Sequence, residues 1–116
     1  MTTLYGISNC DTVKKARAWL TDHGVVYTFH DFKKQGVPIL RLDYWLVNAG
    51  WEKLLNRQGT TWRKLDDNTK AAVTNARSAR ALMLAQPSVI KRPVVEWSAS
   101  TVTVGFDAAD WKTRLK

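Results

Sequence analysis

A single cysteine, Cys10, stands where the sequence predicts a turn between a strand and a helix. The run from Thr3 to Ile7 is typical of a short strand, and the run from Val13 to Leu20 places apolar residues at helical spacing. A thiol at the start of a helix faces unpaired backbone N–H groups and the positive end of the helix dipole, which favour the thiolate. Because the thiolate is the nucleophilic form, this position predicts a reactive thiol.

The residues next to Cys10 have opposing effects on the ionisation of its thiol. Lys14 lies one helical turn beyond Cys10 and could add positive charge, whereas the carboxylate of Asp11 disfavours a second anion. We expect the helix terminus and Lys14 to prevail. Asn9 and Thr12 flank the thiol and are candidates for contact with a substrate. The alternative is that Cys10 is a small buried hydrophobic residue, the usual role of a lone cysteine.

A second thiol is missing from the pattern. Val13 occupies the place that a second cysteine takes in a Cys-x-x-Cys pair, so no dithiol can form within one chain. Redox chemistry at Cys10 would therefore need a thiol from another molecule, and glutathione is the abundant cytosolic candidate. One cysteine also cannot form an internal disulfide, which favours a reducing, cytoplasmic setting. We expect no secretory signal, and no apolar run approaches the ~20 residues of a membrane span.

The balance of charge favours anionic partners. The chain of 116 residues has 18 Lys and Arg against 10 Asp and Glu, a formal net charge of +8. The basic residues are scattered rather than gathered in a run of about five or six, so we do not expect nucleic acid as a partner. A small anionic substrate or a solvated surface accounts for the charge. The sequence contains no His, Cys and carboxylate cluster with metal-ligand spacing, so we expect no metal.

The predicted elements follow the order β-α-β, then a helical insert, then β-β-α. Strands at residues 2–7 and 25–32 flank the first helix, and Gly24 is expected to end that helix. The insert contains helices at 39–50 and 51–56 and a long helical run at 65–87 that divides near Ser78, a plausible N-cap. A hairpin of strands at 92–97 and 101–106 follows. A final helix begins after the capping residue Asp107.

Without the insert at residues 38–86, residues 1–37 and 87–116 have the thioredoxin arrangement. We therefore predict one α/β domain with a thioredoxin-like, mixed four-stranded sheet and a helical insert. In thioredoxin-like folds a proline that opens a strand is cis and faces the nucleophilic cysteine, and Pro93 occupies that place. Arg92 would then point at the pocket; the alternative is an exposed loop arginine.

Three stretches together resemble the ArsC-like family of the thioredoxin superfamily, which is the arsenate reductase and Spx group, and in particular its YffB-like branch. They are LYGISNCDTVKKARAWL, LLNRQGTTWRKL and IKRPVV, and the resemblance covers essentially the entire chain. It implies the fold, a nucleophilic Cys10 and a cis Pro93 that follows a ligand-facing Arg92. The likeness to the YffB-like branch implies a glutathione-dependent thiol reductase.

Several residues depart from the arsenate reductases. Gly6 stands where those enzymes have a histidine, and Lys14 replaces the arginine of their Cys-Gly-Thr-Ser-Arg turn. Their arginine at the end of the middle helix falls at Asn56, next to Arg57, and a third arginine has no clear counterpart. Because lysine cannot replace arginine in bidentate oxyanion binding, we expect most of the arsenate clamp to be lost. Val13 likewise removes the Cys-x-x-Cys switch that is usual in Spx regulators, though it leaves a binding surface.

The sequence thus predicts a glutathione-dependent thiol/disulfide reductase with Cys10 as the catalytic nucleophile and glutathione as co-substrate. The candidate substrate-binding residues are Lys14, Arg92, Pro93, Asn9 and Thr12, with Arg57 assisting if its loop folds over the site. The partners would be glutathione and a thiol, disulfide or small anionic substrate. Two alternatives stay open: a non-enzymatic, Spx-like, transcription-associated module that binds a protein partner, and an arsenate or other oxyanion reductase.

Overall fold

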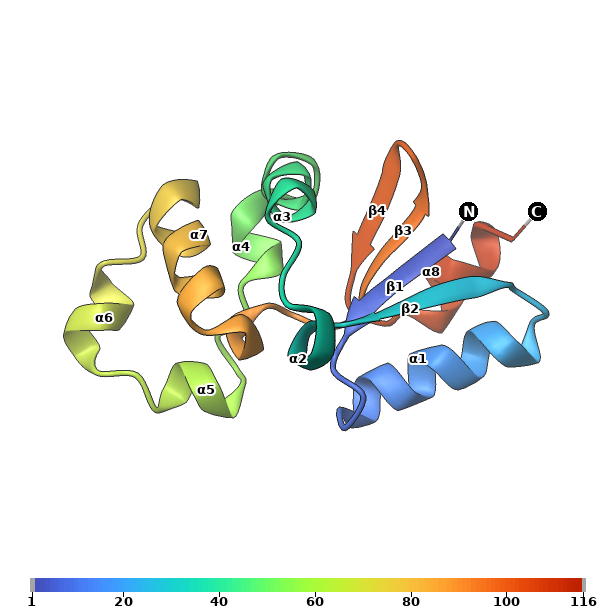
Figure 1. The fold of residues 1–116 in the computed structure, drawn as a ribbon, viewed down its shortest axis with the longest axis horizontal. Helices are drawn as coiled ribbons and strands as arrows, with labels where there is room; N and C mark the ends of the chain where they lie inside the picture. Colours follow the sequence, from blue (N-terminus) through green and yellow to red (C-terminus); the bar gives the residue numbers. More distant parts are fainter. Residues whose placement is uncertain (1, 116) are drawn as a thin grey trace. The chain divides into compact units, whose positions relative to one another are not determined.

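A computed structural model describes residues 2–115 of the chain (Figure 1). Within this range the chain forms two compact units. The first unit ends at Gly36 and resumes at Arg92, and the second unit comprises Val37–Lys91. The second unit is the helical insert, which the sequence placed at residues 38–86.

The first unit is built on a four-stranded mixed sheet, as the sequence predicted (Figure 1). Its strand order is β2-β1-β3-β4; β1 and β2 are parallel, and β3 is antiparallel to both β1 and β4. The strands are β1 (Thr2–Gly6), β2 (Tyr27–Asp31), β3 (Val94–Ser98) and β4 (Thr101–Val104), and the helices are α1 (Asp11–Asp22), α2 (Phe32–Gln35) and α8 (Ala108–Thr113). The parallel pair requires the crossover that α1 supplies, and the short turn between β3 and β4 gives the predicted hairpin.

One face of this sheet carries the hydrophobic core of the unit. The buried residues of the core come from β1, α1, β3 and α8: Leu4, Val13, Ala16, Leu20, Val95 and Trp111. The rings of Trp19, Trp97 and Phe106 meet Trp111 edge-on, with centroid distances of 5.6, 5.0 and 4.8 Å. Each fully buried large apolar side chain contributes about 1.5–3 kcal/mol. Burial of Val13, Ala16 and Leu20 therefore fixes the face that α1 turns to the sheet.

Two helix ends in this unit follow the predicted local signals. The carboxylate of Asp107 accepts a hydrogen bond from the Asp110 N–H (3.1 Å), so Asp107 is the N-cap of α8. Gly24 follows the end of α1 with φ +71°, and its N–H donates to the Thr21 carbonyl oxygen (3.1 Å). Glycine adopts this left-handed conformation without steric cost, which lets the chain leave the helix sharply.

The second unit consists of short helices. They are α3 (Ile39–Trp45), the π-helix η1 (Leu46–Gly50), α4 (Trp51–Leu54), α5 (Thr60–Arg63), α6 (Asp67–Ala71), α7 (Ala76–Ala85) and the 3₁₀ helix η2 (Pro87–Val89). Leu42, Trp45 and Leu46 are buried, as their helical spacing predicted, but Ile39 from the same pattern is 50% exposed. Ile39 is the first residue of α3, at the end of the helix that the chain enters from Pro38.

The long helical run at residues 65–87 breaks earlier than predicted. Helix α7 begins after Asn75, whose side-chain oxygen accepts from the Ser78 N–H (2.9 Å). The Ser78 hydroxyl in turn accepts from the Asn75 N–H (3.1 Å), which completes a capping box. The prediction of Ser78 as the N-cap was therefore wrong: Ser78 is the third residue of the helix and the reciprocal partner of the cap.

Candidate active site

The thiol of Cys10 lies at the N-terminal end of α1. The Cys10 N–H donates to the Ile7 carbonyl oxygen (3.3 Å), and the Cys10 carbonyl oxygen accepts from the Lys14 N–H (2.9 Å). Cys10 has extended backbone angles and is the N-cap of α1. Its side chain is partly exposed, although it packs against the edge of the core. A purely structural, fully buried cysteine does not fit this position.

The pKa of the Cys10 thiol is lowered from its ordinary value by groups at the start of α1 and by Arg92. Partial burial is the largest single influence and raises the pKa, because it disfavours the charged thiolate. The Val13 N–H, the Arg92 side chain, its positive charge and the Thr12 N–H all act in the opposite direction, and together they prevail. The sulfur completes no capping hydrogen bond of standard geometry, so these N–H groups stabilise the charge at longer range.

Arg92 reaches this site from the segment that leads into β3. The Arg92–Pro93 peptide bond is cis, as predicted from the place of Pro93 at the opening of a strand. Pro93 is buried, and Arg92 is partly buried, with its Nε atom inaccessible to solvent. The structure therefore brings Arg92 close to Cys10, from which it is widely separated in the sequence.

The other predicted site residues of this unit lie near the thiol in sequence but are exposed. The side chains of Asn9, Thr12 and Lys14 are accessible to solvent. Among the residues that the structure describes, the positive charge that acts on the Cys10 thiol comes from Arg92 and not from Lys14. The expected contribution of Lys14 is not among the causes of the lowered pKa of Cys10; Lys14 is exposed, and water and salt screen its interaction with the thiolate. Lys14 stays a candidate for binding a substrate.

The turn that carries Cys10 depends on a close contact between Gly6 and Val13. A Cβ atom added at Gly6 would lie 2.8 Å from Val13 Cγ2, closer than such carbons approach in proteins. Val13 is fully buried in the core and has no room to retreat. Glycine at the end of β1 thus lets the first turn of α1 approach the sheet.

A double-mutant cycle tests this contact. Gly6→Ala is expected to destabilise the protein by about 1–3 kcal/mol through overpacking. Val13→Ala should be destabilising alone, but it frees the space that the new methyl group needs, so the double variant should lose less stability than the sum of the two changes. Urea unfolding measures all four proteins. Strictly additive losses would contradict the proposed contact.

The sheet face opposite the core carries a buried polar pair that the sequence analysis missed. The Tyr5 hydroxyl on β1 donates to Glu96 Oε1 on β3 (2.8 Å), and Glu96 is only 9% exposed. The ring of Tyr5 also packs against the ring of His30, with centroids 5.1 Å apart. The sequence feature that could have indicated this pair is the carboxylate of Glu96 within the apolar strand VVEW, because a buried acid needs a hydrogen-bond partner. A hydrogen bond satisfies this buried acid, and the pair ties β1 to β3 beside the cis-proline segment.

Arg57 belongs to the second unit. Its guanidinium carbon lies 5.6 Å from the ring centroid of Trp51 and 5.9 Å from that of Trp62. The predicted contact of Arg57 with a substrate at Cys10 stays a prediction. Trp51 and Trp62, for which the sequence suggested no clear role, hold this arginine by cation–π contacts.

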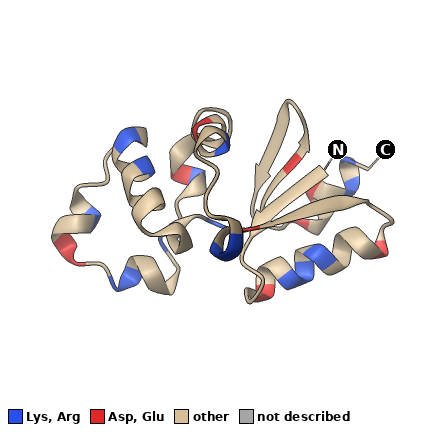
Figure 2. Ribbon diagram, viewed as in Figure 1, with Lys and Arg blue, Asp and Glu red and all other residues tan. Residues whose placement is uncertain are grey.

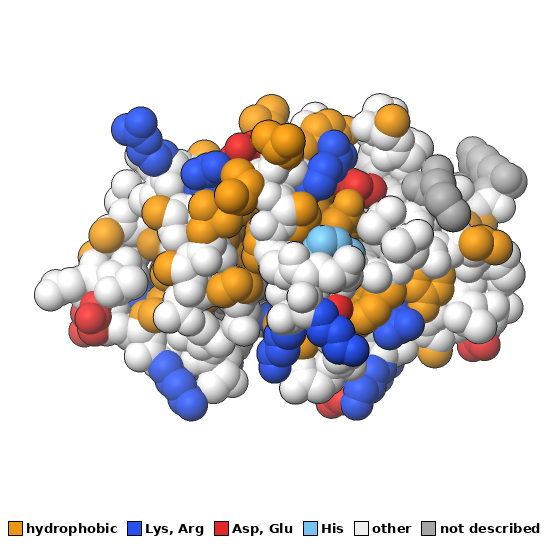
Figure 3. Space-filling view, viewed as in Figure 1, with side chains coloured by type: hydrophobic (Ala, Val, Ile, Leu, Met, Phe, Trp, Pro, Cys, Tyr) orange, Lys and Arg blue, Asp and Glu red, His pale blue; other side chains and the backbone are white. Residues whose placement is uncertain are grey.

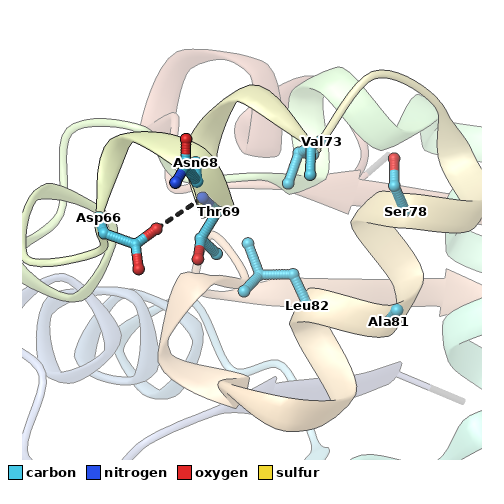
Figure 4. Close-up of a pocket in the computed structure, with 8 residues that line it drawn as sticks. Asp66, Asn68, Thr69, Val73, Ser78, Ala81 and Leu82 are labelled. Carbon is cyan, nitrogen blue, oxygen red and sulfur yellow. Dashed lines mark hydrogen bonds between the residues drawn. The ribbon is translucent and has the colours of Figure 1, made fainter.

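A separate hollow lies between α6 and α7 of the second unit (Figure 4). Apolar side chains such as Val73 and Leu82 line it, and its one carboxylate, Asp66, caps α6 by accepting from the Thr69 N–H (2.6 Å). These residues include no cysteine, and the Ser78 hydroxyl among them takes part in the capping box of α7. Within residues 2–115 no group of three His, Cys, Asp or Glu residues is placed to hold a metal ion. The same range contains no helix that is long and apolar enough to cross a membrane.

These features define a class. The sheet order, the cysteine at the N-terminus of α1 and the cis-proline that follows Arg92 are those of a thioredoxin-like protein with a single cysteine. A family model described as "ArsC family" matches residues 5–114, so the chain belongs to the ArsC family.

Solved structures and curated relatives agree with this assignment. A structure described as the YFFB protein covers 100% of both chains at 47% identity, with a TM-score of 0.93. The solution structure of an arsenate reductase related protein from Brucella melitensis is 54% identical, covers 97% of this chain and 92% of its own, and has a TM-score of 0.77. The global transcriptional regulator Spx of Streptococcus mutans is 28% identical over 92% of this chain and 77% of its own.

Proposed function

We propose that the protein is a cytoplasmic, glutathione-dependent thiol/disulfide reductase in which Cys10 is the only catalytic thiol. The observation that carries this proposal is the lowered pKa of the partly exposed Cys10 thiol, with Arg92 beside it. A lowered pKa raises the fraction of thiolate at neutral pH, and partial exposure gives a disulfide access to the sulfur.

The reaction would proceed in two exchanges. The Cys10 thiolate attacks the glutathionyl sulfur of a mixed disulfide, the sulfur–sulfur bond breaks, and the substrate leaves as a thiolate that takes a proton from water. The thiolate of a second glutathione then attacks the Cys10–glutathione disulfide, which releases oxidised glutathione and restores the Cys10 thiolate. The substrate sulfur is reduced from the disulfide to the thiol level, and the sulfur of the second glutathione is oxidised from the thiol to the disulfide level in return. The glutathionyl sulfur stays at the disulfide level throughout. No second protein cysteine is required.

The surrounding residues would have separate roles. Arg92 stabilises the Cys10 thiolate and offers guanidinium N–H groups to a carboxylate of glutathione. Pro93 fixes the backbone next to Arg92. Asn9, Thr12 and Lys14 are exposed around the thiol and would bind the polar ends of the ligand.

Mass spectrometry after incubation with oxidised glutathione tests the proposal. The wild-type protein is expected to gain one glutathionyl group, to lose it again on addition of reduced glutathione, and to catalyse reduction of a glutathionylated substrate. Cys10→Ser should show none of these reactions while remaining folded, since serine is close in size. Absence of an adduct on folded wild-type protein at millimolar glutathione would contradict the proposal. In a parallel assay we expect little or no arsenate turnover; reduction of arsenate that Cys10→Ser abolishes would instead favour the oxyanion reductase.

A partner-binding module is the second candidate function, and the second unit supports it. Leu40 and Val47 are 83% and 82% exposed on the helical run from α3 to η1, and apolar side chains that gather in one exposed patch are typical of protein interaction sites. Hydrophobic side chains are also visible on the surface of this unit in Figure 3. The likeness to the transcriptional regulator Spx points to the same class. A folded wild-type protein without any glutathione adduct would favour this alternative over the reductase.

A further inference from the structure

A small hollow of about 340 Å³ in the second unit is lined by cationic and amide side chains from α4, from the loop after it and from the segment after η2. We propose that it binds a small oxyanion with two or more negative charges, of the phosphate or polycarboxylate type. The site lies wholly within the second unit and does not depend on the proposed thiol chemistry.

Backbone pairing fixes two walls of this pocket. Leu55 and Ile90 form an antiparallel bridge. On either side of it the Asn56 N–H donates to the Val89 carbonyl oxygen (2.8 Å), and the Lys91 N–H donates to the Leu54 carbonyl oxygen (2.7 Å). The start of the loop and the segment that carries Lys91 are therefore held side by side by backbone hydrogen bonds, which keep their geometry whether or not a ligand is bound.

A tight turn shapes the rim of the pocket. The side-chain oxygen of Asn56 accepts from the Gln58 N–H (3.1 Å), an Asx-type turn. A Cβ atom at Gly59 would lie 2.9 Å from Asn56 Nδ2, so a larger residue at position 59 would displace the Asn56 amide. The turn holds the backbone of Arg57 and Gln58 at the lining of the hollow, and the amides of Asn56 and Gln58 add neutral donors.

Arg57 is positioned by two aromatic rings. Its guanidinium lies within 6 Å of the ring centroids of Trp51 and Trp62, at 5.6 and 5.9 Å, which is the range of cation–π contacts. A guanidinium has five N–H donors, and those that do not meet a ring can bind an oxygen atom. The arginine is thus ordered before a ligand arrives, which lowers the entropic cost of binding.

Charge identifies the kind of ligand. Lys53, Arg57 and Lys91 line one hollow with a single carboxylate, Glu52, among them. These three basic side chains, drawn in blue with the other Lys and Arg residues in Figure 2, repel one another across the same space. An anion with two or more charges offsets this repulsion better than a monovalent ion. The volume suits a phosphate or a small polycarboxylate rather than a polymer that would extend far beyond the hollow.

Titration with inorganic phosphate and with citrate, each at constant ionic strength with chloride as the reference, tests the proposal on the full chain. In ¹H–¹⁵N NMR spectra we expect saturable shifts of the Asn56 and Gln58 amides and of the indole N–H groups of Trp51 and Trp62. A stronger response to phosphate would identify a phosphoryl ligand, and a stronger response to citrate a polycarboxylate; both support the site. Non-saturable shifts, or equal shifts with chloride, would overturn it.

Matched charge deletions locate the anion. Lys53→Ala and Lys91→Ala are each expected to weaken anion binding by about three- to five-fold, because a solvent-exposed charge contributes only modestly to binding. The double variant is expected to weaken anion binding by about ten-fold or more. Lys64→Ala removes the same charge from an exposed lysine of the same unit outside the pocket, and should change binding by less than about two-fold. Equal losses in all three single variants would show general charge attraction and overturn the proposal. Cys10→Ser should bind the anion as the wild type does; a loss there would contradict the independence of this site.

Discussion

Arg92→Ala is expected to weaken glutathione binding by about ten-fold or more and to raise the pKa of the Cys10 thiol. A hydrogen bond to a charged group is worth about 1.5–3 kcal/mol, and 1.4 kcal/mol corresponds to a factor of ten. The same variant also removes the hydrogen bond and the positive charge by which Arg92 lowers the pKa of Cys10. Calorimetric titration with glutathione and the pH dependence of alkylation measure the two effects on the same protein.

Two further variants separate the geometry of Arg92 from its charge. Arg92→Lys should recover only part of the affinity, because an ammonium group cannot pair with both carboxylate oxygens in a planar fork. Lys14→Ala removes an exposed charge one helical turn from Cys10 and should cost less affinity, without the rise in the pKa of Cys10. An equal loss for Lys14→Ala and Arg92→Ala would contradict the assigned role of Arg92, since a general effect of net charge would explain both.

The second large effect is the pH dependence of Cys10 reactivity. Alkylation by iodoacetamide should follow an ionisation with its midpoint below the ~8.5 of a free cysteine, because only the thiolate reacts. At neutral pH the folded protein should therefore react faster than the same protein unfolded in urea, although the folded thiol is less exposed. A midpoint at or above the free value, or alkylation only after unfolding, would restore the interpretation of Cys10 as a buried structural residue.

The lowered pKa also predicts how stability depends on pH. The folded protein gives up the Cys10 proton at a lower pH than the unfolded chain does. Its free energy of unfolding, relative to that of Cys10→Ser, should therefore rise with pH between the folded and unfolded pKa values and stay constant above the unfolded value. This additional stability is lost as the pH falls through the pKa of Cys10 in the folded protein. A difference between the two proteins that shrinks as the pH rises would contradict a lowered pKa. Urea unfolding at several pH values measures it.

Local signals were enough to predict much of the first unit. Alternating and helical apolar patterns predicted the β-α-β and β-β-α order, and the capping carboxylate of Asp107 predicted the start of α8. Cys10 could be placed at the N-terminus of α1 because a strand and a helix with a short turn between them leave it no other place. Each of these features depends on residues close together in the sequence, and the backbone conformation that such residues prefer is visible from the sequence itself.

Competing local signals left other boundaries open. Asn75 and Ser78 are both good N-cap residues, and the sequence did not show that they act as a reciprocal pair. The π-helical turn of η1 likewise has no clear sequence pattern. Its position depends on how Trp45 and Leu46 pack, and packing overrides small differences in local preference.

Tertiary structure alone decided which charged residue acts on the Cys10 thiol and which side chains fit in the turn between β1 and α1. The sequence determined that the one cysteine caps a helix and that a proline after an arginine opens a later strand. It did not determine that Arg92 rather than Lys14 lowers the pKa of Cys10, or that Val13 excludes a side chain at Gly6. The physical reason is that electrostatic interaction and steric exclusion depend on distance in space. Those distances are set when the sheet brings β1 and β3 together, and spacing along the chain does not record them.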